Sequence, residues 1–481
     1  GKTIQVIAAL SLMRAQQSEL NALLVVPASL IQNWKIEATK FAPHLSVLIA
    51  HGSAMKASTL AALSEDTTIQ YDVVITTYGT IKQHKVLAGY SWDAVVVDEA
   101  QAIKNAGSQQ SRAIKKINAS WKIALTGTPV ENNLGDLWSI FDFINPGLLG
   151  NGADFKRYLK AVRKRAEKKH AKKKYTEKKS VGSTMSRAET GVNYNALRTL
   201  VQPYMLRRLK TDKKVIQDLP DKTEIKVYSF LSALQATLYQ QEIDQAKELL
   251  ASKEVDSKIK RQGLVLKLFG ILKQICNHPY QSMLSSNLAG GMPPGDDAEL
   301  SGKFARLVSL ATTIAESNEK FLVFTQYRSM CDKLSTFLET TIGKAGLVLH
   351  GQTPIGKRQE MVACFQQDDD VGHMVLSLKA GGTGLNLTAA THVIHFDRWW
   401  NPAVENQATD RAFRIGQKMP VFVHKFICRG TIEERIDRVI SAKQSLSEDI
   451  LSQDGVLKHF TDMSDDALLE TIGLDLSANI R

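Results

Sequence analysis

Short apolar runs alternate with amphipathic stretches in two separate blocks of the chain. In the first block, which extends to about residue 145, residues 22–26 and 73–77 are rich in β-branched side chains and end at polar or small residues. Such runs are typical of strands that are buried on both faces. Residues 4–13 and 29–40 have helical spacing beside them. This alternation predicts βα units and a parallel sheet covered by helices.

The second block repeats the pattern after a mainly helical middle. Its candidate strands are residues 321–324, 347–349, 374–377, 393–396 and 421–423. We therefore predict an α/β fold with two parallel-sheet lobes and helical insertions between them. The expected divisions are a first lobe at 1–145, a basic helical protrusion that returns to this lobe at 146–231, a helical linker at 232–298, a second lobe at 299–440 and a helical tail at 441–481.

Two adjacent carboxylates follow the apolar run at residues 94–97. Because ligands bind at the carboxyl ends of strands in open α/β sheets, Asp98 is suited to hold Mg²⁺ and Glu99 to orient an attacking water. A solvated acidic turn would show the same local pattern. Gly1-Lys2-Thr3 precedes an apolar helix and matches the second half of a phosphate-binding loop, whose Lys contacts phosphates and whose Thr binds Mg²⁺. The two features together predict a two-part nucleotide site.

Composition narrows the class of protein. Hydrophobic residues make up 43% and charged residues 23% of the 481 positions, as in ordinary globular domains. No apolar run is as long as a membrane span, so we expect no membrane partner. The four cysteines lie far apart without a CxxC pair, which argues against a zinc site and fits a reducing compartment. The chain begins without Met, so we expect it to be a fragment.

Positive charge is concentrated in one segment. Residues 156–179 contain thirteen Lys and Arg against two Glu, a net +11 of the +12 of the whole chain. With few apolar residues, this segment cannot supply a buried helix face. It is either a solvated helix or loop, or an arm that contacts phosphates. In a eukaryote the run at residues 168–179 could instead serve nuclear targeting. His278, near the end of the helical middle, is interpreted as structural.

Motifs that run along most of the chain resemble those of the SWI/SNF-type DNA translocases of helicase superfamily two. The matching stretches are residues 1–3 (GKT), 25–30 (VVPASL), 32–34 (QNW), 75–78 (ITTY), 98–101 (DEAQ), 125–129 (LTGTP), 206–210 (LRRLK), 274–280 (QICNHPY), 323–327 (VFTQY), 350–351 (HG), 378–387 (LKAGGTGLNL), 399–402 (WWNP) and 407–417 (QATDRAFRIGQ). The resemblance implies two RecA-like lobes, ATP and Mg²⁺ as cofactors, and a monomeric motor that acts on double-stranded DNA and on proteins bound to it.

The resemblance also implies roles for single residues. Lys2, Thr3 and Asp98 would hold Mg·ATP together with Gly1, while Glu99 and Gln101 would organise the water. Gly382 and Gly384 let a backbone approach a phosphate of ATP or DNA. Arg411 and Arg414 are three positions apart, so they share a face if residues 406–414 are helical, and their guanidinium groups suit a phosphoryl transition state. The expected DNA contacts are Thr76, Thr77, Thr126, Thr128, Gln326, Lys379 and Trp399.

Two departures from the family pattern leave alternatives open. The upstream half of the phosphate loop does not precede Gly1, and Gln101 stands where better-known eukaryotic members have His. The main prediction is an ATP-driven translocase that tracks the DNA backbone and remodels protein–DNA complexes. The alternatives are a strand-separating helicase and a binding module that does not hydrolyse ATP. The expected location is the cytoplasm, at the nucleoid, for a bacterial source, which we favour, and the nucleus for a eukaryotic one.

Overall fold

The computed structural model describes residues 2–63, 70–127, 134–162, 164, 194–206, 219–251, 258–281, 296–381, 385–444, 460–461 and 463–475. The chain divides into two compact units, which we call unit 1 (residues 1–209 with 446–450) and unit 2 (residues 210–445 with 451–481). Within the described ranges, no helix has the length and apolar character that crossing a membrane requires.

Unit 1 is built on a five-stranded sheet of strand order β2-β3-β1-β4-β5 in which all neighbours are parallel. The strands are β1 Ala22–Val26, β2 Val47–Ala50, β3 Val73–Thr77, β4 Ser91–Val97 and β5 Asn118–Ala124. The helices are α1 Lys2–Gln16, α2 Ile31–Phe41, α3 Ala57–Ala61, α5 Tyr78–Gln83, α6 Lys85–Gly89, α7 Gln109–Lys115, α8 Leu134–Ile144 and α10 Asn195–Val201, with 3-10 turns η1 Ala28–Leu30, η2 Ala100–Ile103 and η3 Gln202–Tyr204. The predicted parallel sheet is confirmed.

Alternate side chains of these strands enter two different cores, because successive residues of a strand point to opposite faces. Leu24 of β1 and Val96 of β4 pack with α1 and α2 on one face. Leu23 and Val95 pack on the other face with α5, α7 and α8. Burial on both faces explains why the strands are continuous apolar runs.

Unit 2 contains a six-stranded parallel sheet of order β6-β11-β10-β7-β9-β8. The strands are β6 Lys222–Ser229, β7 Lys320–Thr325, β8 Ala345–Leu349, β9 Val371–Ser377, β10 Ala390–His395 and β11 Val421–Cys428. The helices are α11 Ala233–Ala251, α12 Lys258–Asn277, α14 Asp297–Leu300, α15 Gly302–Glu316, α16 Arg328–Ile342, α17 Ile355–Gln367, α18 Leu378–Gly381, α19 Pro402–Thr409, α20 Ile432–Gln444 and α22 Asp465–Ile472. The second predicted α/β lobe is thereby confirmed.

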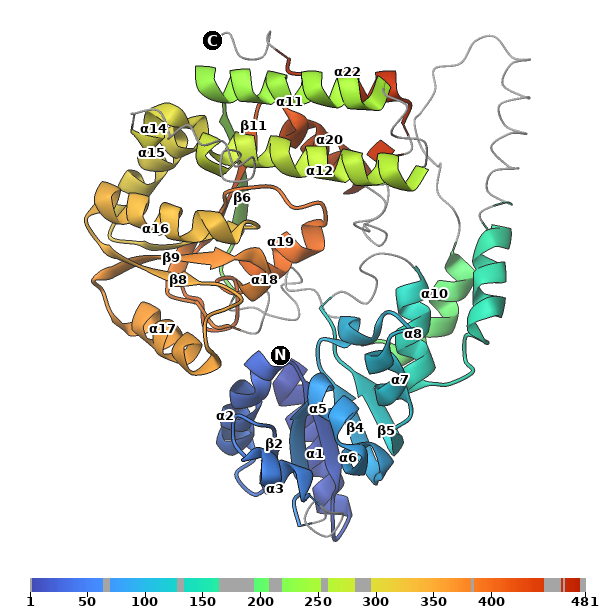
Figure 1. Cartoon of the computed structure of the whole chain (residues 1–481). Helices are drawn as coiled ribbons and strands as arrows, with labels where there is room; N and C mark the ends of the chain where they lie inside the picture. Colours follow the sequence, from blue (N-terminus) through green and yellow to red (C-terminus); the bar gives the residue numbers. More distant parts are fainter. Residues whose placement is uncertain are drawn as a thin grey trace, which may run out of the picture. The chain divides into compact units, whose positions relative to one another are not determined.

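Strand β6 corrects one part of the predicted organisation. Residues 146–231 were expected to return to the first lobe, but β6 pairs with β11 along its whole length, at the edge of the unit 2 sheet (Figure 1). Most positions of β6 are exposed, as an edge strand permits, so it lacks the apolar run that marked the other strands. Its register with β11 is fixed in part by Glu224, which binds Lys425.

Helices α11 and α12 form a separate layer of unit 2 with α20 and α22 (Figure 1). The core of this layer includes Leu268, Leu272 and Ile275 of α12. Trp400, from the loop after β10, is also part of this core. The layer therefore connects the helical middle of the chain to the sheet of unit 2.

Candidate functional site

In unit 1, Asp98 lies at the carboxyl end of β4, and its side chain is only 7% exposed. The Trp34 indole Nε1 of α2 donates to Asp98 Oδ2 at 3.0 Å, and the Glu99 backbone N–H donates to Oδ1 at 2.8 Å. The Tyr78 hydroxyl donates to the Asp98 carbonyl at 2.6 Å. Burial and the nearby Asp98 and Glu99 carboxylates raise the pKa of Tyr78, so this hydroxyl stays protonated and remains a donor. Asp98 is thus held from three sides.

The Glu99 side chain is linked through Gln101 to Thr126, which follows strand β5. The Glu99 backbone has the left-handed conformation (φ 51°, ψ 56°), which is uncommon for a residue other than Gly. Glu99 Oε2 accepts from Gln101 Nε2 at 2.6 Å, and Gln101 Oε1 accepts from the Thr126 hydroxyl at 3.0 Å. The Gln101 amide therefore connects the predicted water-orienting acid to Thr126, just after β5.

The predicted phosphate-binding residues Lys2 and Thr3 form the first turn of α1. Helix α1 packs on the sheet and is followed directly by β1, so its N-terminus lies at the carboxyl edge of the strands, as Asp98 does. Lys2 is exposed and Thr3 is half-buried. Gly1 lies outside the described residues. The topology therefore places the two predicted parts of the nucleotide site at the same edge of one sheet.

The threonines that were predicted to contact DNA have partners within unit 1. Thr76 is fully buried and donates to the Ala50 carbonyl at 2.9 Å. Thr77 caps α5, since its hydroxyl accepts from the Thr80 backbone N–H at 3.2 Å. Both side chains are accounted for by the fold, and their contact with DNA stays a prediction. Thr128 lies outside the described residues.

In unit 2, Arg411 and Arg414 follow α19 and do not share a helix face. The condition for a shared face, a helix over residues 406–414, is not met, because α19 ends at Thr409 and the chain continues in turns. The Arg411 side chain is 8% exposed, and its carbonyl accepts from the Leu387 N–H at 3.0 Å. Arg414 Nη1 donates to the Leu385 carbonyl at 3.4 Å. The turn therefore packs against residues 385–387, which follow Gly382 and Gly384, two glycines outside the described residues.

The predicted DNA contacts of unit 2 lie at the carboxyl ends of three strands. Gln326 follows β7, and its backbone N–H donates to Asp397 Oδ1 at 3.0 Å. Lys379 is exposed at the start of α18, after β9. Trp399 follows β10, and its N–H donates to Glu405 Oε1 at 2.7 Å. Since all strands of this sheet are parallel, these residues share one edge.

Trp400 differs from Trp399 in its surroundings. Its ring is 8% exposed and stacks on Phe269 of α12, with the ring centroids 5.5 Å apart and the planes at 22°. It also belongs to the core of the helical layer. Core packing therefore describes Trp400, whereas Trp399 is half-buried at the sheet edge.

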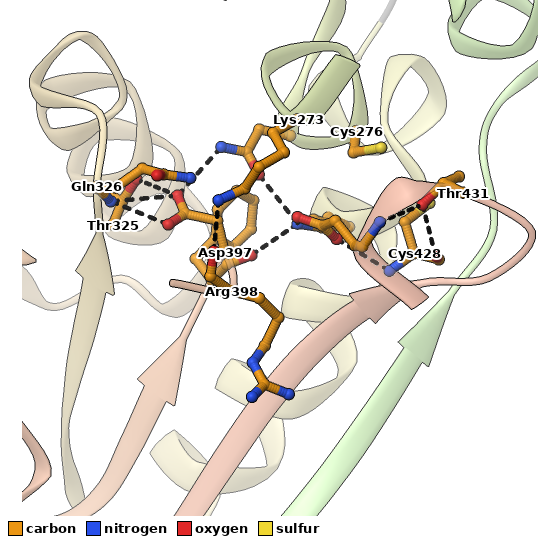
Figure 2. Close-up of polar contacts among 12 residues, drawn as sticks. Lys273, Cys276, Thr325, Gln326, Asp397, Arg398, Cys428 and Thr431 are labelled. Atoms are coloured by element: carbon orange, nitrogen blue, oxygen red, sulfur yellow. Dashed lines mark hydrogen bonds and ion pairs between the residues drawn. The ribbon is translucent and has the colours of Figure 1, made fainter. Parts of the chain in front are cut away.

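A cluster of buried charges in unit 2 was missed by the sequence reasoning. Its members all have an exposed fraction below one tenth and come from four elements and one loop: Lys273, Lys303, Asp397, Arg398, Glu405, Glu433 and Asp437. Figure 2 shows Lys273, Asp397 and Arg398 in one polar group, between Thr325 and Gln326 on one side and Cys428 and Thr431 on the other. Only Lys273 gives a sequence signal, as a charge within the apolar face of a helix.

Magnesium fits the donor set of unit 1 better than a metal that needs many protein ligands. Within the described ranges, no group of three or more His, Cys, Asp or Glu side chains could enclose an ion. Mg²⁺ is commonly bound by one or two protein oxygens together with water and substrate phosphates. The Asp98 carboxylate, fixed by Trp34 and the Glu99 N–H, and the Thr3 hydroxyl are ligands of this kind.

Comparison with known protein families gives two matches in chain order. The SNF2-related domain matches residues 1–281, more than half of the chain, and the helicase conserved C-terminal domain matches residues 302–416. The first match extends beyond unit 1 and includes β6, α11 and α12 of unit 2. The division between the families therefore differs from the division between the compact units.

Curated relatives match nearly the whole chain. A Bacillus subtilis protein named as an ATP-dependent helicase/translocase, YwqA, is 40% identical over 484 residues, covering 99% of this chain and 48% of its own. An uncharacterized ATP-dependent helicase of Mycoplasma genitalium is 35% identical, covering 98% of this chain and 41% of its own. The chain thus spans about half the length of the curated relatives it matches.

Among solved structures, the Sulfolobus solfataricus SWI2/SNF2 ATPase core in complex with dsDNA is 35% identical and covers 99% of this chain and 91% of its own. Its TM-score is 0.45. The fold of this chain is established by its own two parallel sheets. Three observations point to the same family: the sequence motifs, their positions at the carboxyl edges of the two sheets, and the domain matches. The chain belongs to the family of proteins with an SNF2-related domain followed by a helicase C-terminal domain.

Proposed function

We propose that this chain is the motor of an ATP-driven translocase of double-stranded DNA that remodels protein–DNA complexes. The observation that supports the proposal most is the connected row Asp98, Glu99, Gln101 and Thr126 at the edge of the unit 1 sheet. Membership of the family and the name of the Bacillus relative support the use of ATP.

The proposed chemistry assigns one task to each part of the row. Lys2 would hold the phosphates, and Thr3 and Asp98 would hold Mg²⁺, which would supply positive charge beside the transferred phosphoryl group. Glu99 orients the attacking water, and the bond from Gln101 fixes one of its carboxylate oxygens. Because Gln101 also accepts from Thr126, a change at Thr126 can alter how Glu99 is held.

Arg411 and Arg414 supply the positive charges that the transition state needs in this proposal. Guanidinium groups stay charged at all relevant pH values, and such fingers contribute about 10³–10⁵ in rate in the phosphoryl-transfer enzymes where they have been measured. Gln326, Lys379 and Trp399 contact the DNA backbone, together with the threonines of unit 1. Contacts of this type give little sequence preference and strong dependence on salt.

The test compares ATP hydrolysis with and without double-stranded DNA, for the chain as it is and for Lys2→Ala. We expect duplex DNA to stimulate hydrolysis and the substitution to abolish it. Displacement of a third strand from a DNA triplex then reports translocation, and separation of a short duplex reports helicase activity. Duplex separation at a rate that matches ATP turnover would favour the strand-separating helicase, and DNA binding without any hydrolysis would favour the binding module.

A further inference from the structure

Residues 396–401, which connect β10 to α19, are held by one face of α12. Lys273 Nζ donates to the Arg398 carbonyl. Asn277 Nδ2 donates to Asp397 Oδ2 at 3.1 Å. The Phe269 ring stacks on Trp400. These three α12 residues are spaced by four positions each, so they lie in a row along the helix.

The same segment is tied to the predicted functional residues of unit 2. The Asp397 carboxylate accepts from the Gln326 N–H and from the Thr325 hydroxyl, the latter at 2.6 Å. The Arg398 guanidinium donates to Glu405 in α19 at 3.0 Å, and Glu405 also accepts from the Trp399 N–H. Helix α19 leads directly to Arg411 and Arg414. One short segment thus connects residues from three separate motifs.

Lys303 holds the beginning of this segment from another helix. Its Nζ is fully buried and donates to the Phe396 carbonyl at 2.9 Å, to Asn277 Oδ1 at 3.0 Å and to Glu433 Oε1 at 2.7 Å. Asn277 therefore receives from Lys303 and donates to Asp397, so the two helices act on the segment through a shared side chain. The backbone carbonyls of Phe396 and Arg398 thus each accept a hydrogen bond from a buried lysine.

The charges of this cluster favour a role in positioning over a role in stability. Lys273 and Lys303 are balanced by Asp397 and Glu433, and a buried ion pair often stabilises a fold no better than apolar residues of the same size. Burial lowers the pKa of Lys273 to about 8, against the opposing effect of Asp397 and Glu433, so the amine remains mostly protonated at neutral pH. A protonated amine bonded to a carbonyl fixes where the backbone lies, which apolar packing alone does less sharply.

We propose that the α12 row Phe269, Lys273 and Asn277 positions residues 396–401, and that Lys273 is a positioning residue for DNA-stimulated ATP hydrolysis. The proposal rests on the proposed function and adds to it a mechanical part that touches neither nucleotide nor DNA. Loss of the Lys273 bond lets the Arg398 carbonyl move. Gln326, Trp399 and the start of α19 then lose their common support.

Lys273→Met tests the proposal, with Lys320→Met as the matched control. Lys320 also donates to backbone carbonyls, those of Phe365 and Asp368, and is in contact with no part of residues 396–401. We expect Lys273→Met to lower the DNA-stimulated kcat about tenfold, as small displacements of working groups do. The KM for ATP should stay within about twofold, because Lys2, Thr3 and Asp98, the residues proposed to hold Mg·ATP, belong to unit 1. Lys320→Met should change neither.

A spectroscopic readout separates this proposal from the proposed function. With 5-fluorotryptophan incorporated, the ¹⁹F resonance of Trp399, assigned with Trp399→Phe, should shift in Lys273→Met and stay in place in Lys320→Met. Trp400 is unsuitable because Lys273 Nζ lies 5.2 Å from its ring centroid and affects it directly. If the unaltered chain hydrolyses no ATP, the proposed function fails while the Trp399 resonance still tests the positioning.

Phe269→Leu provides a second variant that removes no charge. It takes away the ring stack on Trp400 and should shift the Trp399 resonance and lower kcat in the same direction, by about threefold, which corresponds to a stacking contribution of about 0.7 kcal/mol. It carries the test if Lys273→Met does not fold. The proposal is overturned if the folded Lys273 or Phe269 variant matches Lys320→Met in kcat and in the Trp399 resonance.

Discussion

The two units hold their predicted functional residues in different ways. In unit 1, the Glu99 backbone N–H donates to Asp98, and side-chain hydrogen bonds join Glu99 to Gln101 and Gln101 to Thr126, all at the ends of two adjacent strands. In unit 2, the supports of Gln326 and Trp399 are buried charges from distant parts of the chain. Contacts between residues that are close in the sequence can be recognised as motifs, whereas contacts between residues from distant parts of the chain cannot. Variants of the unit 1 residues should therefore lose catalytic activity, whereas variants of the buried charges in unit 2 should lose stability or the geometry of the residues they support.

Glu99→Gln should have the largest effect on chemistry. The amide keeps the size of the side chain but cannot orient or deprotonate water as a carboxylate does, so DNA-stimulated hydrolysis should fall by about 10²–10⁴. ATP binding should persist, because Lys2, Thr3 and Asp98 are unchanged. Turnover and nucleotide affinity are the measurements, with the exposed Glu19→Gln as the control. Turnover near that of the control would contradict the role of Glu99.

Lys303→Met should have the largest effect on stability. It removes one charge of a fully buried pair and leaves Glu433 without its partner, which in comparable cases costs about 3–5 kcal/mol. Urea unfolding measures the loss, with Lys344→Met as a control, since Lys344 is half-buried at the surface and donates to the neutral side chain of Asn318. Adding Glu433→Gln should cost less than the sum of the two single changes. A loss below about 1 kcal/mol would show that the pair is not a support.

The strands of both sheets could be predicted where they are buried on both faces. The bounds of the strands at residues 22–26 and 73–77 could be predicted, because a parallel strand that is buried on both faces is a nearly continuous apolar run. Strand β6 could not, since its exposed edge carries charges such as Glu224. Its partner β11 lies about two hundred residues further along the chain, so no local pattern reveals the pairing.

The same limit applies to the site. Asp98 and Glu99 could be predicted as site residues because two acids follow an apolar run and Gly1-Lys2-Thr3 precedes an apolar helix in the same block. Whether Arg411 and Arg414 share a helix face could not be predicted, because the spacing of two residues does not reveal where the backbone hydrogen bonds of a helix stop. Trp34 was found only as part of a motif. Its bond to Asp98 depends on α2 packing against the sheet.

Trp34→Phe should weaken the response to Mg²⁺. Phenylalanine keeps most of the buried volume but removes the indole N–H that fixes Asp98 Oδ2, and partners of metal ligands commonly contribute about tenfold or more to metal affinity or activity. We therefore expect the Mg²⁺ concentration for half-maximal hydrolysis to rise about tenfold. Trp92→Phe is a matched control, because Trp92 is equally buried and donates its indole N–H to the Leu87 carbonyl. Equal Mg²⁺ dependence of the two variants would remove Trp34 from the site.

Mild acid should weaken unit 2 before unit 1. Four histidines of unit 2 are largely buried, and burial lowers the pKa of each to about 4: His278, His373, His395 and His424. A histidine with a lowered folded-state pKa stabilises the fold above its unfolded pKa of about 6.5, and this stability is lost as the pH falls towards 4. Each should cost about 1 kcal/mol by pH 5.5.

His395→Gln should make the loss of unit 2 stability in mild acid smaller, and this is the smallest of the predicted effects. His395 Nε2 lies 2.9 Å from the Thr409 hydroxyl, a contact that an uncharged amide can replace without binding a proton. Urea unfolding followed through the ¹⁹F resonances of Trp399 and Trp400 reports unit 2, and those of Trp34 and Trp92 report unit 1. Between pH 6.5 and 5, the stability of unit 2 should fall less steeply in the variant, by up to about one proton in the slope. An unchanged slope would mean that His395 is not protonated when the chain unfolds, and the acid sensitivity of unit 2 would then have to arise from the other three histidines.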